Sequence, residues 1–483
     1  MTDNSLKRKV FSGMIWRISE RGSIQFINFA LQIVLARILS TDDYGILAIL
    51  SAFINISTTL INNGLVNSLI QKKNSDDLDL NTIFWIQFGI SIVLVGILFV
   101  MAPFVAAYYC NDMITEYLRV MSILLIVESL STIQLTVLRK RLEFKKSFFA
   151  NVIGTIVYGI VGISLAINNC GCWSLIWAQI AMKIAVLVVL LFRVRWVPRF
   201  AFSFHRFASM FSYSWKLTVG WLLGTLHQNI FSLVIGKCFP TSVLGYYNRA
   251  QNLPNTMTVT LNETISNVMF PALSLIQDDA RKMKTVTRRM MRVTAFVVCP
   301  IMAGIAGISK SFVLVFLKEK WAPSIPLMQI FCIVYGINVI STTNMQTFNA
   351  IGRSDVFMKA EIVKRSLSLV VLLLMVRIGI LAVVIGLSIM GLYSLCYNAY
   401  QNRKVLGYSI AEQGKDILIS FVCAVFMFGI VELINWISLA YSVTLVIQIF
   451  VGVISYLMLS YLLNKEVLSE VFVIVRSAIH HSK

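Results

Sequence analysis

The sequence predicts an all-α protein that crosses a membrane many times. Of its 483 residues 58% are hydrophobic and only 13% are charged, and the mean hydropathy is +0.79. An ordinary soluble domain carries about 25% charged residues. Apolar runs of about 20 residues, the length of a helix that spans a bilayer, recur from end to end. These observations exclude a soluble globular domain and a disordered chain.

Apolar runs separated by short polar segments predict about 14 transmembrane helices, with 12 as the alternative if the last two are additions to a smaller fold. No predicted connection is longer than about 15 residues, which argues against a large soluble domain. The predicted helices cover residues 12–36, 44–70, 81–108, 116–138, 147–167, 173–192, 207–235, 246–275, 290–316, 327–350, 360–378, 380–401, 416–435 and 441–463.

The distribution of basic residues predicts the orientation of the chain. Both termini and the connections on their side, together with the adjoining helix ends, carry 30 Lys and Arg residues, whereas the connections and helix ends on the other side carry 6. Cytoplasmic loops are enriched in Lys and Arg. We therefore expect both termini to be cytoplasmic.

The net charge of +20 does not indicate a nucleic-acid partner, because the basic residues lie between hydrophobic runs. At these positions Lys and Arg contact anionic membrane lipids. The sequence also lacks a Walker A loop, a dinucleotide-binding glycine turn and an HExxH helix, and it has only four histidines. We expect no catalytic residues, no metal site and no cofactor, apart from a coupling ion such as Na⁺ or H⁺.

A faint internal repeat appears when the sequence is shifted by 200 residues. Residues 35–45 align with residues 235–245: each segment ends one predicted helix, carries a basic residue and opens the next helix at a glycine. Six predicted helices separate the copies, so both halves run in the same direction, as in transporters built from parallel repeats. The predicted parts are an N-terminal lobe (1–206), a C-terminal lobe (207–403), and two extra helices with a cytoplasmic tail (404–483).

The first predicted helix carries ionisable residues where they are costly. Each charge at the centre of a membrane helix costs roughly 2.5–3.5 kcal/mol on insertion scales. Arg17 and Arg21 align with Gln25 and Asn28 on one helical face, and Glu20 lies beside them. We expect this stripe to face protein or water; a simpler alternative is that Glu20 only neutralises an arginine of its own helix.

Further polar residues lie in predicted spans of both halves. They predict a polar central cavity that binds an anionic, sugar-bearing substrate, because a guanidinium group binds phosphate through paired hydrogen bonds and amides form hydrogen bonds with sugar hydroxyls. The substrate-binding candidates are Arg17, Glu20, Arg21, Gln25, Asn28, Asn62, Lys216, His227, Asn255 and Asn262, and the ion-coupling candidates are Glu20, Glu128 and Glu263. Lys183 is a further candidate for a deep cation, with the alternative that it extends to the membrane interface.

Several segments resemble a known family. The matching segments are Ser12–Trp16, Glu20–Gly22, Leu35–Ser40, Asp43–Gly45 and Leu244–Ala250. Together they resemble the polysaccharide transporter branch of the multidrug/oligosaccharidyl-lipid/polysaccharide (MOP) exporter superfamily, with its Wzx- and WzxC-like flippases.

This resemblance implies two six-helix lobes around a central cationic cavity. It implies flipping of undecaprenyl-diphosphate-linked oligosaccharide across the bacterial inner membrane for lipopolysaccharide, capsule or exopolysaccharide biosynthesis, in contact with polysaccharide assembly machinery. The alternatives are a lipid II flippase, a multidrug antiporter and, from another class, a membrane glycan polymerase or ligase. The absence of aspartate from the interior of the predicted spans argues against the antiporter, and the short loops argue against the polymerase or ligase.

Overall fold

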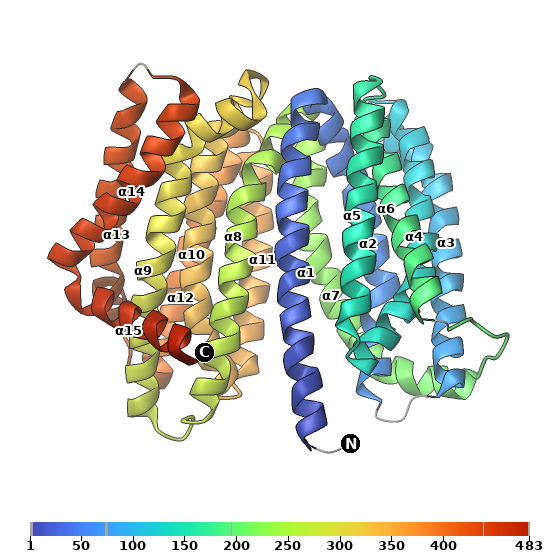
Figure 1. Ribbon diagram of the computed structural model, residues 1–483, viewed down its shortest axis with the longest axis horizontal. Coiled ribbons are helices and arrows are strands. Elements are labelled where there is room, and N and C mark those ends of the chain that lie inside the picture. The colour runs from blue at the N-terminus through green and yellow to red at the C-terminus, as the bar shows by residue number, and fades with distance from the viewer. Residues whose placement is uncertain (1–2, 73–75, 195, 438, 482–483) are drawn as a thin grey trace. The chain divides into compact units, whose positions relative to one another are not determined.

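The protein is built from long helices (Figure 1). The computed structural model describes residues 3–72, 76–194, 196–437 and 439–481; of these, the side chains of residues 3–15, 17–18, 21, 63, 71, 213, 354, 357 and 474–481 lie outside the description. The α-helices are α1 (Asp3–Ile38), α2 (Thr41–Gln71), α3 (Asp77–Tyr109), α4 (Met113–Arg141), α5 (Phe144–Ile167), α6 (Cys172–Val194), α7 (Phe204–Cys238), α8 (Thr241–Ser274), α9 (Ala280–Phe312), α10 (Ser324–Ala350), α11 (Ser354–Met375), α12 (Ile380–Leu406), α13 (Ile410–Leu433), α14 (Tyr441–Leu463) and α15 (Lys465–His481).

Eleven helices of the described chain are long and apolar enough to cross a membrane, and the C-terminal half of α1 (Gly22–Ile38) is a shorter apolar segment. The predicted class, an all-α polytopic membrane protein, is confirmed. The helices α8 and α11 are not among these eleven, because α8 is rich in asparagine and threonine and α11 carries several charged residues. The count of 14 spans stays a prediction.

The sequence itself sets where many of these helices begin. Ser40 caps α2: its hydroxyl accepts a hydrogen bond from the Asp43 amide at 3.1 Å, and the Asp43 carboxylate accepts one from the Ser40 amide at 2.9 Å. The same reciprocal capping box starts α3, with Asp76 at its cap, and α13, with Ser409. Each box satisfies backbone donors that a helix N-terminus leaves unpaired.

The chain forms two compact units, residues 1–245 and 246–483. In unit 1, α5 packs against α1 and α6, α4 packs against α3 and α6, and α2 packs against α4 and α7. In unit 2, α9 packs against α10, α13 and α14, while α12 packs against α10 and α11. The units divide the chain after α7, whereas the predicted lobes divide it before that helix. The predicted lobes describe which helices move together during transport, and their boundaries stay a prediction.

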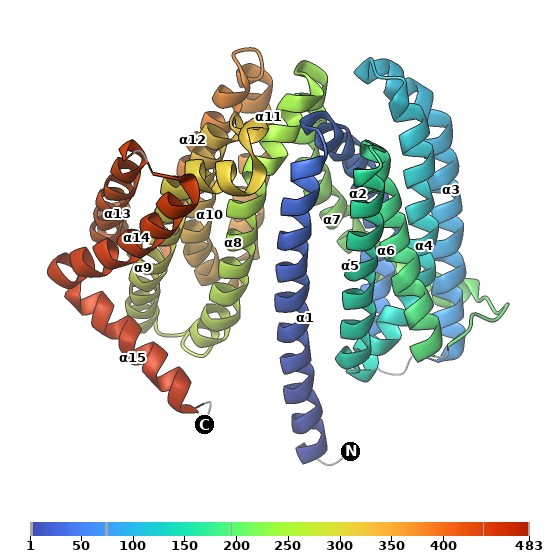
Figure 2. The same cartoon turned by 45° about the horizontal axis from the view of Figure 1, so that its top comes forward.

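In unit 2, α15 turns away from the axis of α14 and packs against α9 (Figure 2). Val467 of α15 is buried in a core that α9, α10, α13 and α14 supply. An ion pair joins Glu470 of α15 to Arg289 of α9 at 3.4 Å. The C-terminal helix is therefore docked on unit 2 through an apolar face and a charged contact.

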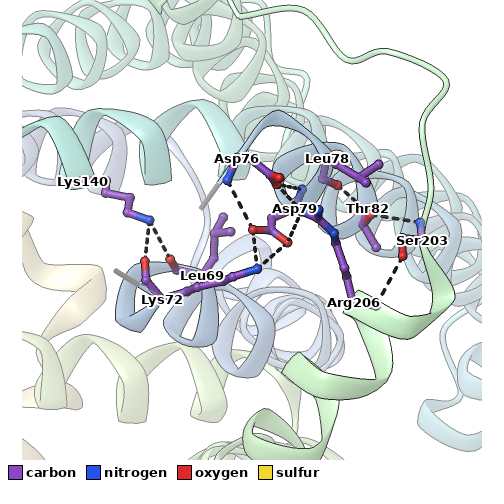
Figure 3. A network of polar contacts seen from close by, with 9 residues as sticks. All are labelled: Leu69, Lys72, Asp76, Leu78, Asp79, Thr82, Lys140, Ser203 and Arg206. Carbon is purple, nitrogen blue, oxygen red and sulfur yellow. Dashed lines mark hydrogen bonds and ion pairs between the residues drawn. The ribbon is translucent and has the colours of Figure 1, made fainter. Parts of the chain in front are cut away.

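A network of polar contacts holds one end of unit 1 together (Figure 3). The buried carboxylate of Asp79 binds Lys72 Nζ at 2.6 Å and Arg206 at 3.1 Å, and Arg206 also pairs with Asp76. Lys140 donates to the carbonyl oxygen of Lys72 at 2.7 Å. These contacts hold the end of α4 and the start of α7 against the end of α2 and the start of α3.

The connection from α6 to α7 lies along the first turns of α3. The Arg199 amide donates to Asn81 Oδ1 at 2.7 Å, and the indole of Trp85 donates to the Arg199 carbonyl at 2.9 Å. The rings of Trp85 and Phe200 stack with centroids 4.7 Å apart. This connection therefore places α7 in unit 1, where it forms one wall of the cavity described next.

Candidate functional site

The middle of α2 presents a polar face inside an otherwise apolar span. Asn55, Thr58, Thr59 and Asn62 recur at intervals of three and four residues, which places them on one side of the helix. The hydroxyls of Thr58 and Thr59 bond carbonyls of the preceding turn. The amides of Asn55 and Asn62 reach neighbouring helices instead.

One of these neighbours is α4, which carries a carboxylate into the same region. Asn62 donates to Glu128 Oε1 at 3.3 Å and accepts a hydrogen bond from Thr132 at 2.9 Å. The other carboxylate oxygen of Glu128 pairs with Lys183 Nζ of α6 at 2.5 Å. The Lys183 side chain is 38% exposed and that of Glu128 is 21% exposed, so the pair is partly open and not sealed in a core.

The fourth helix of the site is α7, which forms hydrogen bonds with the polar face of α2. Asn55 donates to Asn229 Oδ1 at 3.5 Å, and the hydroxyls of Thr59 and Thr225 lie 3.0 Å apart. Asn229 also donates to the carbonyl of Thr225 at 2.8 Å. These contacts orient the polar face of α7 toward that of α2.

The four helices surround a cavity of about 420 Å³, which we call the unit-1 cavity. Its volume lies within the range of small-molecule sites. Its polar lining consists of amides, hydroxyls and one ion pair, and its apolar lining consists of three aliphatic side chains. The lining residues are Ile54, Asn55, Thr58, Thr59, Asn62, Leu124, Leu125, Glu128, Gln179, Lys183, Thr225, Gln228 and Asn229.

Two predicted site residues, Asn62 and Glu128, meet at this cavity and hydrogen-bond each other. Lys183 also lines it, in an ion pair. The Lys183 amine turns to Glu128, and its predicted depth in the membrane stays a prediction.

The first helix contributes Glu20 to a different contact. Glu20 Oε1 accepts hydrogen bonds from Asn151 at 2.5 Å and Ser147 at 3.3 Å, both on α5. The side chains of Arg17 and Arg21 lie outside the described residues, so their predicted role stays a prediction. Gln25 is exposed and Asn28 is half-buried, and neither lines the unit-1 cavity.

The remaining candidates do not line this cavity either. On α7, Lys216 is exposed with its amine 6.0 Å from the Trp215 ring centroid, and half-buried His227 stacks on Phe231 at 5.7 Å. In unit 2, Asn255 and Glu263 are exposed on α8, whereas Asn262 is half-buried. Among the described residues, no cluster of three His, Cys, Asp or Glu side chains could hold a metal ion.

The candidate set omitted seven polar residues of the cavity, although their spacing carried a signal. They are Asn55, Thr58, Thr59, Gln179, Thr225, Gln228 and Asn229. Those on α2 and α7 recur every three or four residues, and Gln179 precedes Lys183 by one turn. The same stripe criterion that singled out α1 would have found them.

Comparisons with solved structures define the fold class. The chain superposes on the lipid II flippase MurJ in an inward-closed conformation with a TM-score of 0.77, at 15% identity, over 94% of this chain and 100% of that one. It superposes on an inward-facing MATE-family multidrug resistance transporter of the MOP superfamily with a TM-score of 0.64, at 11% identity, over 79% and 95%. The chain therefore shares its fold with these two proteins.

Sequence comparison gives the family. Residues 34–326 match the family described as polysaccharide biosynthesis protein, and the chain belongs to this family. It is 27% identical to the lipopolysaccharide biosynthesis protein WzxC of Escherichia coli strain K12 over 368 residues, 74% of each chain. It is 22% identical to the succinoglycan biosynthesis transport protein ExoT of Rhizobium meliloti strain 1021 over 360 residues, 74% of this chain and 72% of that one. The resemblance seen in the sequence is confirmed.

Proposed function

We propose that this protein flips undecaprenyl-diphosphate-linked oligosaccharide units across the bacterial inner membrane, by alternating access, for the biosynthesis of a surface polysaccharide. The observation that carries the proposal is the unit-1 cavity: a hydroxyl- and amide-lined space of about 420 Å³ within the apolar spans of four helices. Polar groups inside membrane helices mark substrate and ion pathways. Family membership and the names of WzxC and ExoT supply the kind of substrate.

The protein moves its substrate and does not convert it chemically. A MOP fold serves transport in MurJ and in the MATE transporter, as their names state. In this proposal Arg17, Arg21 and Lys216 bind the diphosphate. Glu20, Glu128 or Glu263 couples the movement to H⁺ or Na⁺, both termini are cytoplasmic, and polysaccharide assembly proteins use the flipped unit.

Deletion of the gene in its host tests the proposal. We expect one surface glycan to disappear while its lipid-linked precursor accumulates on the cytoplasmic side, and the wild-type gene to restore both. Accumulation of the peptidoglycan precursor instead would assign the protein to lipid II, and an unchanged glycan profile would overturn the proposal.

Reconstituted vesicles test the charge assignment. The purified protein should move lipid-linked oligosaccharide to the opposite leaflet, and an Arg17→Ala/Arg21→Ala/Lys216→Ala protein made at normal levels should lose this activity. Flipping by that variant at the wild-type rate would show that these cations do not bind the diphosphate.

A further inference from the structure

The unit-1 cavity contains two amides that have no hydrogen-bond partner within the described part of the chain. These amides are Gln179 of α6 and Gln228 of α7, and both line the cavity. Gln179 is half-buried and Gln228 is exposed, so neither amide is sealed away from the space inside the cavity. Both amides are therefore placed to bond water or a ligand inside the cavity.

The other lining groups have the same chemistry. Asn55, Asn62 and Asn229 each present an amide, which both donates and accepts. The hydroxyls of Thr58 and Thr59 donate to carbonyls of their own helix and keep their acceptor lone pairs. A sugar hydroxyl also donates and accepts. The aliphatic side chains of Ile54, Leu124 and Leu125 form an apolar section of the wall that suits the C–H face of a pyranose ring.

The charge of the cavity argues against a phosphorylated ligand. Among the described lining residues the charged ones are Glu128 and Lys183, which neutralise each other at 2.5 Å. A diphosphate bound here would face the Glu128 carboxylate, or would have to take Lys183 from it and leave that carboxylate unpaired. The cavity thus favours an uncharged, hydroxyl-rich ligand.

We infer that the unit-1 cavity is a sugar subsite, which takes an uncharged residue of the glycan through Gln179, Gln228 and the amides of α2 and α7. The inference rests on the proposed function and adds to it that the glycan and the diphosphate are bound by separate groups of side chains. In this arrangement the Glu128–Lys183 pair fixes α4 to α6 as part of the wall.

Removal of the two unpartnered amides tests the subsite. A Gln179→Met/Gln228→Met protein keeps side-chain length and loses only hydrogen-bonding capacity. We expect at least a tenfold fall in glycan export, with accumulated lipid-linked precursor and normal amounts of protein in the membrane. The matched control is Gln134→Met, a buried amide of α4 that does not line the cavity and should leave export unchanged.

Photo-crosslinking identifies the ligand even when the structure of the glycan is unknown. p-Benzoylphenylalanine in place of Gln228 should form an adduct whose mass includes an uncharged sugar residue in cells that make the lipid-linked glycan. The same probe in place of Phe99, an exposed residue of α3 (50% exposed), should capture membrane lipid only.

The outcomes separate the two proposals. If wild-type protein flips the substrate but the double methionine variant exports normally, or if position 228 captures only phospholipid or an acidic sugar, the subsite is overturned and the proposed function stands. If gene deletion changes no surface glycan and no precursor accumulates, the proposed function fails first.

Discussion

The Glu128–Lys183 ion pair joins two helices inside the apolar part of unit 1. Lys183 Nζ lies 2.5 Å from Glu128 Oε2, and Asn62 bonds the other oxygen at 3.3 Å. Removing one partner of such a pair leaves an uncompensated charge, which is worse than removing both. The pair therefore stabilises unit 1 only as long as both residues are present.

A double-mutant cycle tests this dependence. We expect Glu128→Gln and Lys183→Met to lower the thermal unfolding temperature of the purified protein more than the double variant does, with a coupling energy of about 1 kcal/mol. The measurement is thermal unfolding of the four proteins in one detergent. If the effects of the two substitutions simply add, the ion pair does not contribute to stability and the prediction is wrong.

Arg206 keeps the Asp76–Asp79 corner, where α3 begins, insensitive to pH near neutrality. The guanidinium holds the pKa of Asp76 below its ordinary value of 3.8, mainly through a direct hydrogen bond. A carboxyl group whose pKa is lowered by folding stabilises the folded state above its unfolded pKa and loses this effect only in stronger acid. The corner should therefore stay intact between pH 5 and 8.

Hydrogen exchange in residues 196–203 checks this expectation. Protection of the α6–α7 connection should be the same at pH 5 and pH 8 after correction for the intrinsic rate, whereas Arg206→Gln should reduce protection at both values. Protection that falls as the pH drops from 8 to 5 would show that another group, with a higher pKa, controls this corner.

At the scale of helices, the starts of α2 and α8 cross at two glycines that occupy equivalent repeat positions. A Cβ at Gly45 would lie 1.8 Å from the carbonyl oxygen of Thr241, and one at Gly245 would lie 2.2 Å from that of Thr41. Asp42 also accepts a hydrogen bond from the Thr241 hydroxyl. The 200-residue repeat is thus present in the helix boundaries, since α1 and α7 end, and α2 and α8 begin, at equivalent positions.

Alanine at either glycine should separate these helix ends, because the obstructing atoms belong to the backbone and cannot rotate away. We expect Gly45→Ala and Gly245→Ala each to destabilise the protein by about 1–3 kcal/mol and to reduce glycan export. Gly89→Ala is the matched control, since a Cβ there meets nothing within 4 Å. Wild-type stability in the two crossing variants, measured by thermal unfolding, would contradict this close contact.

At the scale of the whole molecule, the excess of Lys and Arg on one set of connections predicts the orientation in the membrane. Cysteine labelling tests it in a background in which all eight native cysteines, which are free, have been replaced. An impermeant maleimide should label Arg377→Cys in intact cells but reach Lys282→Cys only after permeabilisation. The reverse pattern would place both termini outside.

The sequence predicted which segments are helical and apolar, and less well which side chains meet. The predicted spans 81–108 and 441–463 agree closely with α3 and α14. The length and hydropathy of an apolar run are properties of the sequence alone and do not depend on neighbouring helices. Asn62 and Glu128 were found because an amide or carboxylate in such a run is conspicuous. Lys183, which pairs with Glu128, was left with two interpretations, since a lysine can extend in several directions.

The sequence by itself determined the class of protein, the family and most helix boundaries, because apolar run length, caps and short motifs are local properties of the chain. Only the tertiary structure decided that α7 packs on α2, that Lys183 faces Glu128, and that four polar faces enclose one cavity. These outcomes depend on how each helix is rotated about its axis and which neighbour it packs against. Many weak contacts between residues distant in the chain set that choice, and no local pattern encodes them.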